Sequence, residues 1–136
     1  MTVSPPVIPV QATPATILVI DDDLAMRTIL GITLTALGYV ILAAADGEKA
    51  LEIARVHPEI RLIILDVVMP GFSGKKLEEQ LRINLPGCSV LYCSGHPASV
   101  LPRYGIDPGA QNFLQKPCRP PELERKIEEL LALGQG

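Results

Sequence analysis

The strongest constraint on the fold is an alternation that starts at residue 17. Short apolar runs rich in Val, Ile and Leu alternate with longer runs in which apolar residues recur at helical spacing. We predict that the short runs are strands, at residues 17–21, 39–43, 62–66, 89–93 and 111–114. Such alternation is typical of right-handed βαβ units around a parallel sheet. The sequence therefore predicts an α/β fold, a doubly wound parallel sheet of five strands with five helices.

The length of the chain bounds its domain organisation. A chain of 136 residues fits one hydrophobic core and is too short for a core plus a separate catalytic domain. Residues 1–16 hold four prolines among small residues, a composition typical of an extended linker or tail. We therefore expect a single domain over residues 17–133, followed by a short C-terminal tail at 134–136.

Capping and breaking residues place the predicted helices. The first helix should end at Gly38 and bury one stripe, formed by Met26, Ile29, Leu30, Leu34 and Leu37. Asp46 and Ser73 stand where side-chain oxygens cap the second and third helices. Prolines and glycines crowd residues 97–109, so we expect the fourth helix to be short or distorted. Residues 122–133 have regular helical spacing and predict the fifth helix.

Composition and charge exclude several classes of function. The net charge is −3, so no broad basic face exists for nucleic acid, and direct nucleic-acid binding is not expected. The longest apolar runs are too short to cross a membrane, and no secretion signal is visible at the amino terminus. Three cysteines without a C-x-x-C pair are typical of a reducing compartment. We expect a cytoplasmic location.

Polar residues follow four of the predicted strands. Three acids, residues 21–23, come after the first strand, Asp66 after the third, Ser94 after the fourth and Lys116 after the fifth. In a doubly wound sheet, ligands bind beyond the carboxyl ends of the strands. We therefore expect these side chains to meet in one crevice. Alone, the three acids could also act only as a solvated cap for the first helix.

The residue types in this crevice indicate a cation and phosphoryl chemistry. A nucleotide binder would carry a glycine-rich loop after its first strand, whereas this chain carries acids. Carboxylates and a backbone carbonyl are the oxygen ligands that suit Mg²⁺. Lys116 and the Ser94 hydroxyl could then bind phosphoryl oxygens, which leaves Asp66 as the nucleophile that forms an acyl phosphate.

Four stretches resemble the signatures of response-regulator receiver domains. They are ILVIDDD at 17–23, LDVVMPGFSG at 65–74, LYCSG at 91–95 and FLQKP at 113–117. Their order and their places at successive strand ends make the set specific, and the resemblance covers nearly the whole chain outside the N-terminal tail. It implies a flavodoxin-like receiver fold with strand order 2-1-3-4-5. The sequence around Asp66 and Ser94 is also similar to that of receivers of hybrid histidine kinases.

The resemblance implies a role for each residue of the metal and phosphoryl site. Asp66 would accept a phosphoryl group from a histidine kinase or a phosphotransfer protein. Asp22 would bind Mg²⁺, Asp21 would help through a water molecule, and the backbone carbonyl of Val68 would be a further ligand. Lys116 would neutralise the phosphoryl group. Such a domain assists its own phosphorylation and dephosphorylation but is not a turnover enzyme.

The resemblance also implies a conformational switch. Ser94 would move toward the phosphoryl group while the ring of Phe113 turns inward. A downstream protein partner would bind the face formed by the fourth helix, fifth strand and fifth helix. His96, two residues after Ser94, borders the site in this family and could influence attack of water on the phosphoryl group, or be an ordinary solvated loop histidine.

Three other functions remain open from the sequence alone. A haloacid-dehalogenase-like phosphatase also forms an aspartyl phosphate at a strand end, but it needs Asp-x-Asp-x-Thr or Val where this chain has DDDLA at 21–25. A pseudo-receiver scaffold would bind partners without phosphorylation, and the intact set of acids, serine and lysine disfavours it. A DNA-binding regulator would require an effector domain beyond this chain.

Overall fold

The computed structural model describes residues 14–69, 71–107, 109, 112–116 and 119–133. Residues 1–13 of the predicted tail at 1–16 and the whole predicted tail at 134–136 lie outside these residues, as does residue 111 at the start of the predicted fifth strand.

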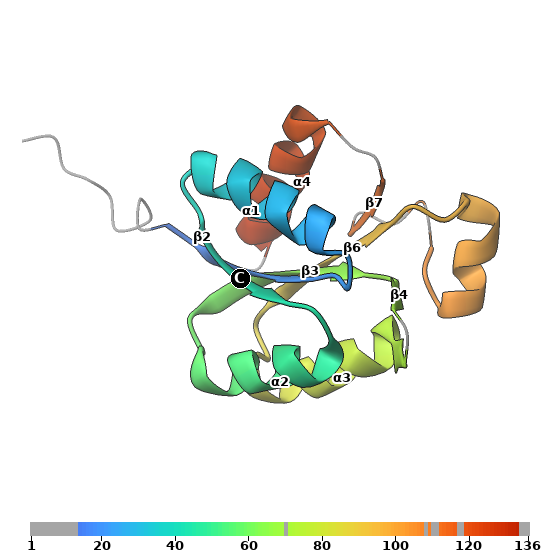
Figure 1. The fold of residues 1–136 in the computed structure, drawn as a ribbon, viewed down its shortest axis with the longest axis horizontal. Coiled ribbons are helices and arrows are strands. Elements are labelled where there is room, and N and C mark those ends of the chain that lie inside the picture. Colours follow the sequence, from blue (N-terminus) through green and yellow to red (C-terminus); the bar gives the residue numbers. More distant parts are fainter. Residues whose placement is uncertain (1–13, 70, 108, 110–111, 117–118, 134–136) are drawn as a thin grey trace, which may run out of the picture.

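A five-stranded parallel sheet forms the centre of the protein (Figure 1). Its strands are β1 (Thr16–Ile20), β2 (Val40–Ala44), β3 (Ile60–Asp66), β6 (Ser89–Ser94) and β7 (Phe113–Gln115). The order across the sheet is β2-β1-β3-β6-β7, and all four neighbouring pairs are parallel. This confirms the predicted doubly wound sheet with strand order 2-1-3-4-5. A small antiparallel pair, β4 (Val68–Met69) with β5 (Phe72–Ser73), was not predicted.

Helices cover both faces of the sheet. The four α-helices of the described residues are α1 (Leu24–Ala36), α2 (Gly47–Val56), α3 (Gly74–Asn84) and α4 (Pro120–Leu133). Figure 1 shows α1 and α4 on one face of the sheet, with α2 and α3 on the other. Each face therefore buries its own apolar layer. One layer is centred on Leu18, Ile63 and Leu77 and the other on Ile17, Leu34 and Ile127.

The fourth helix is a 3₁₀-helix, η2 (Ala98–Tyr104), which lies past the carboxyl end of β6 and is drawn in orange in Figure 1. Pro102 lies inside it and has no N–H to donate to an α-helical hydrogen bond. Gly105 ends it with a φ of 77°, a left-handed conformation that glycine adopts without strain. The predicted short, distorted element is confirmed in form.

Two of the residues predicted to cap or end helices act as expected. The side chain of Asp46 accepts a hydrogen bond of 2.8 Å from the Lys49 backbone N–H and caps α2. Gly38 follows the end of α1 with a φ of 99°, which favours glycine.

Three details of the predicted elements are wrong. The sheet starts at Thr16, which pairs with Val40 and Ile60, so this residue does not belong to the linker. Ser73 stands at the N-cap position of α3 but makes no side-chain capping hydrogen bond. In α1 the predicted stripe is only partly buried, because Ile29 and Leu37 are 56% and 38% exposed. The buried stripe of α1 is narrower than the sequence pattern suggested.

A polar network joins α3 to the inner strand β6. Glu78 accepts a hydrogen bond from the Tyr92 hydroxyl and another of 2.8 Å from Arg82 Nε. Burial alone would raise the pKa of Glu78, but these two hydrogen bonds and the positive charges of Arg82 and Lys75 together outweigh it and hold the pKa below its ordinary value. Arg82 also donates to the Cys88 carbonyl at 2.8 Å, so the middle of α3 is tied to β6 and its last turn to the loop before that strand.

Candidate functional site

The carboxyl ends of four strands converge at one edge of the sheet. Asp21 follows β1, Asp66 ends β3, Ser94 ends β6 and Lys116 follows β7. The ladders set this alignment, because Asp66 pairs with Cys93 in β6 and Ser94 pairs with Gln115 in β7. The strand-terminal residues that were predicted to meet in one crevice therefore lie at the same edge of the sheet.

Three carboxylates of this edge lie close together. Asp21, Asp22 and Asp66 each offer an oxygen, and these oxygens lie within 4.8 Å of one another. Asp21 is buried, Asp66 is half-buried and Asp22 is exposed, so the cluster opens to solvent on one side. Clustered carboxylate oxygens with access to water fit Mg²⁺, which keeps several water ligands. The structure thus brings together the three carboxylates predicted as metal ligands.

The remaining predicted ligand is a backbone group. Val68 begins β4, two residues after Asp66, so its carbonyl belongs to the same loop edge as the carboxylates. Its role as a ligand stays a prediction.

Asp21 is fixed by hydrogen bonds to both its side chain and its backbone. Its Oδ1 accepts from the Asp23 N–H at 2.9 Å, and its own N–H donates to the Ala44 carbonyl at 3.2 Å. The Arg27 guanidinium donates to the Asp21 carbonyl at 2.7 Å from the second turn of α1. These contacts hold a buried carboxylate in one orientation. Arg27 is a supporting residue that the sequence analysis missed.

Asp23, the third acid of the first loop, has a different role. Its side chain accepts a hydrogen bond of 2.9 Å from the Ala25 N–H and caps α1. The capping interpretation of the three acids thus holds for Asp23 alone, and it is not a member of the carboxylate cluster.

Lys116 brings a positive charge to the carboxylates. Its Nζ lies 2.6 Å from Asp21 Oδ2 and 3.9 Å from Asp66 Oδ2. Burial would lower the pKa of Lys116, but the hydrogen bond to Asp21 and the charge of Asp66 outweigh it and raise the pKa. The side chain is therefore a cation at neutral pH, placed to attract an anionic group that approaches Asp66.

Ser94 is fully buried, and its hydroxyl has local partners. Its Oγ accepts a hydrogen bond of 3.0 Å from the His96 backbone N–H and lies 3.4 Å from His96 Nδ1. Gln115, another residue missed from the sequence, donates its side-chain amide to the Ser94 carbonyl at 3.3 Å and to the His96 carbonyl at 2.7 Å. The serine hydroxyl is thus engaged within its own loop.

Phe113 packs inside the protein. It is 6% exposed and belongs to the same apolar layer as Tyr92, Leu101 and Ile106. The ring is thus buried in this structure. Its pairing with Ser94 in a switch stays a prediction.

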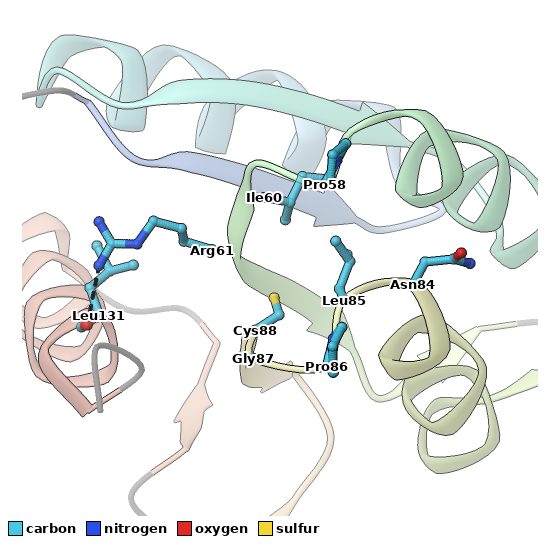
Figure 2. A pocket seen from close by; sticks show the side chains of 9 residues that line it. All are labelled: Pro58, Ile60, Arg61, Asn84, Leu85, Pro86, Gly87, Cys88 and Leu131. Atoms are coloured by element: carbon cyan, nitrogen blue, oxygen red, sulfur yellow. Dashed lines mark hydrogen bonds between the residues drawn. The ribbon is translucent and has the colours of Figure 1, made fainter.

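Among the hollows outside the carboxylate cluster, two show how the site is placed. An apolar groove of about 510 Å³ between α1 and α4 reaches the site, since Gly95 and Lys116 line it with Met26, Ile29, Leu30, Thr33, Pro120 and Leu123. A smaller pocket of about 190 Å³ lies near the amino ends of β3 and β6, at the opposite end of the sheet (Figure 2). In it Arg61 donates to the Leu131 carbonyl at 3.4 Å. None of the residues lining this second pocket belongs to the acid cluster.

Comparisons with known proteins agree with this geometry. Residues 17–128 match the response regulator receiver domain family. Over 118 residues the chain is 39% identical to a probable transcriptional regulator, ycf27, of Cyanophora paradoxa. The matching region covers 85% of this chain and 47% of that protein. The chain thus spans about half the length of such relatives. No helix within the described ranges has the length and apolar character needed to cross a membrane.

Solved structures of receiver domains have the same fold. A CheY-like receiver domain protein from Methanospirillum hungatei superposes with a TM-score of 0.78 at 25% identity, covering 90% of this chain and 97% of that one. The receiver domain of the hybrid histidine kinase CckA gives a TM-score of 0.72 at 35% identity, covering 85% and 98%. The chain belongs to the response regulator receiver domain family. It is thus a receiver domain of the kind found in two-component signalling.

Proposed function

We propose that the chain accepts a phosphoryl group on Asp66 from a phosphohistidine and that this changes its output surface. One observation carries the proposal: the Asp66 carboxylate lies at a strand end with a lysine ammonium 3.9 Å away and two further carboxylates within 4.8 Å. A nucleophile, a cation for the incoming anion and oxygen ligands for a metal are the parts that phosphoryl transfer to a carboxylate requires.

The transfer step uses the Asp66 carboxylate as nucleophile. One of its oxygens attacks phosphorus and forms an O–P bond, while the P–N bond to the donor histidine breaks and its electron pair returns to the imidazole nitrogen. Lys116 neutralises charge on a phosphoryl oxygen, because its carboxylate neighbours, against the effect of burial, keep it protonated next to Asp66. Positioning and electrostatics supply most of the rate enhancement in such reactions.

The carboxylate cluster is the proposed Mg²⁺ site. Asp22 and Asp66 would bind the ion, Asp21 would help through a water molecule, and the Val68 carbonyl would be a further ligand. When bound, the ion would remove the repulsion among the carboxylates and neutralise charge on the transferred group. The arrangement of Asp21 supports this assignment, since its backbone and side chain are held by Ala44, Asp23, Arg27 and Lys116.

The proposed switch pair is Ser94 and Phe113. Ser94 ends the strand next to Asp66, and its hydroxyl would leave His96 and turn to a phosphoryl oxygen. The segment that follows Ser94 leads into η2, and Phe113 belongs to the same buried apolar layer as Leu101 of that element. Movement of Ser94 would thus reach the face formed by η2, β7 and α4, which we propose as the binding surface for a downstream protein.

The donor would be a histidine kinase or a phosphotransfer protein in the cytoplasm. Support comes from the groove between α1 and α4, which is apolar and reaches Lys116 and Gly95 at the edge of the site. A donor helix lying there would have its histidine near Asp66. The protein would assist its own phosphorylation and dephosphorylation without turning over an external substrate.

Mass spectrometry of phosphotransfer tests the proposal. We expect wild type with acetyl phosphate and Mg²⁺ to gain one phosphoryl group, and we expect none in Asp66→Asn or without the metal. Equal labelling of both proteins would contradict the assignment of Asp66, and failure of the folded wild type to gain mass would favour a scaffold. Continuous hydrolysis of p-nitrophenyl phosphate would indicate a phosphatase instead.

A further inference from the structure

The loop after β6 is held by the side chain of Gln115, which is not one of the residues proposed to bind the metal or the phosphoryl group. The Gln115 amide nitrogen donates to the carbonyls of Ser94 at 3.3 Å and His96 at 2.7 Å. An amide nitrogen has two hydrogens, so one side chain can serve both carbonyls. The Lys116 backbone N–H also donates to the Ser94 carbonyl, at 2.7 Å, but that bond continues the parallel ladder and needs no particular side chain.

The two carbonyls held by Gln115 bracket the turn that engages the Ser94 hydroxyl. Within that turn the His96 N–H donates to Ser94 Oγ at 3.0 Å. In the proposed switch the Ser94 hydroxyl must leave the His96 N–H to reach a phosphoryl oxygen on Asp66. Any contact that keeps His96 next to Ser94 therefore favours the first state over the second.

We propose that Gln115 is a positioning residue that holds the turn 94–96 closed and so biases Ser94 toward its resting orientation. This inference rests on the proposed function, because it needs a phosphoryl group for Ser94 to turn to. Gln115 itself is exposed and touches the backbone of the turn rather than any reacting atom. Its removal should change the equilibrium of the switch while it leaves the nucleophile and the cation in place.

The test is the affinity for beryllofluoride, a phosphoryl analogue, in the presence of Mg²⁺. Gln115→Met keeps the length of the side chain but removes both donors. Because two partly exposed hydrogen bonds restrain only the resting state, we expect Gln115→Met to bind the analogue about three- to tenfold more tightly than wild type. Gln80→Met, at an exposed glutamine of α3, is the matched control and should bind as wild type does.

The direction in which the affinity for beryllofluoride changes separates a positioning role of Gln115 from a general disturbance of the structure. A purely structural role would weaken analogue binding in Gln115→Met, so an unchanged or lower affinity in the folded variant would overturn the inference. The effect must also act through the serine hydroxyl. In a Ser94→Ala background, the same substitution should therefore change the affinity by less than twofold, and a full effect there would equally overturn it.

A second readout follows the turn directly. Hydrogen exchange of the His96 amide should be faster in Gln115→Met than in wild type without the analogue, because its hydrogen bond to Ser94 opens more often. Unchanged exchange would contradict the restraint. If wild type itself does not bind beryllofluoride, the proposed function fails; if wild type binds and Gln115→Met does not bind more tightly, only the role of Gln115 fails.

Discussion

Replacing the proposed phosphoacceptor should stabilise the metal-free protein. Asp66→Asn removes one of three negative charges whose oxygens lie within 4.8 Å, and also one partner of Lys116 Nζ at 3.9 Å. With an effective dielectric of about 20, each repulsion at 4.8 Å is roughly 3.5 kcal/mol and the attraction at 3.9 Å roughly 4 kcal/mol. The two repulsions therefore exceed the attraction to Lys116 by about 3 kcal/mol.

Solvent screening reduces this gain, because Asp22 is exposed and Asp66 only half-buried. We expect Asp66→Asn to be about 1 to 3 kcal/mol more stable than wild type in EDTA, a rise in Tm of roughly 3 to 10 °C. Urea unfolding followed by circular dichroism measures the difference. Glu52→Gln, which removes an equally negative charge from a largely exposed pair with Lys49, is the control and should stay within about 0.5 kcal/mol of wild type.

Added Mg²⁺ should stabilise the wild type more than Asp66→Asn. A ligand that binds only the folded state stabilises it by mass action, and the wild type offers one more carboxylate than the variant. We therefore expect millimolar Mg²⁺ to raise the unfolding midpoint of wild type more than that of Asp66→Asn. The reasoning is refuted if the variant is the less stable protein in EDTA, or if Mg²⁺ stabilises both proteins equally.

Three further substitutions test other parts of the description. The pKa of Glu78 is lowered in the folded state, so its contribution to stability is present above the ordinary carboxyl pKa and is lost as the pH falls through the folded value. Wild type should consequently lose more stability than Glu78→Gln between pH 6 and pH 3 in urea titrations, and parallel losses would contradict the hydrogen bonding with Tyr92. Asp23→Ala should cost about 1 kcal/mol through loss of the α1 cap but leave Mg²⁺ affinity within about twofold in calorimetry, whereas a large loss of affinity would make Asp23 a ligand. Gly74→Ala should lower stability by about 1 to 3 kcal/mol in thermal unfolding, because the new Cβ would lie 3.3 Å from the Val67 carbonyl oxygen; wild-type stability would show that the backbone at Val67, between β3 and β4, moves aside easily.

The sequence predicted the sheet and the place of the site because both depend on local patterns. Unbroken apolar runs mark strands that are buried on both faces, and the polar residue after each run must lie at the same edge when all strands are parallel. Asp21, Asp66 and Lys116 were found in this way, and the structure places them within ion-pair distance.

The details that the sequence did not predict depend on contacts between distant segments. The exposure of Ile29 follows from the groove between α1 and α4, where no other helix of the described residues covers it. Helical spacing identifies an apolar stripe but does not determine how much of that stripe the neighbouring helix covers. The contacts of Gln115 likewise join the end of β7 to the loop after β6, and no periodic pattern marks a side chain that binds backbone carbonyls.

The proline-containing 3₁₀-helix η2 gives the protein a surface whose residues can be substituted without changing the residues of the carboxylate site. Two buried side chains, Leu101 and Ile106, anchor this segment, while Pro102, Arg103 and Tyr104 between them face solvent. A 3₁₀ turn carries weaker hydrogen bonds than an α-helix, so exposed positions here are replaced at little cost to folding. Related chains could thus acquire new binding partners by substitution within a few residues, while the carboxylates, the lysine and the serine stay the same.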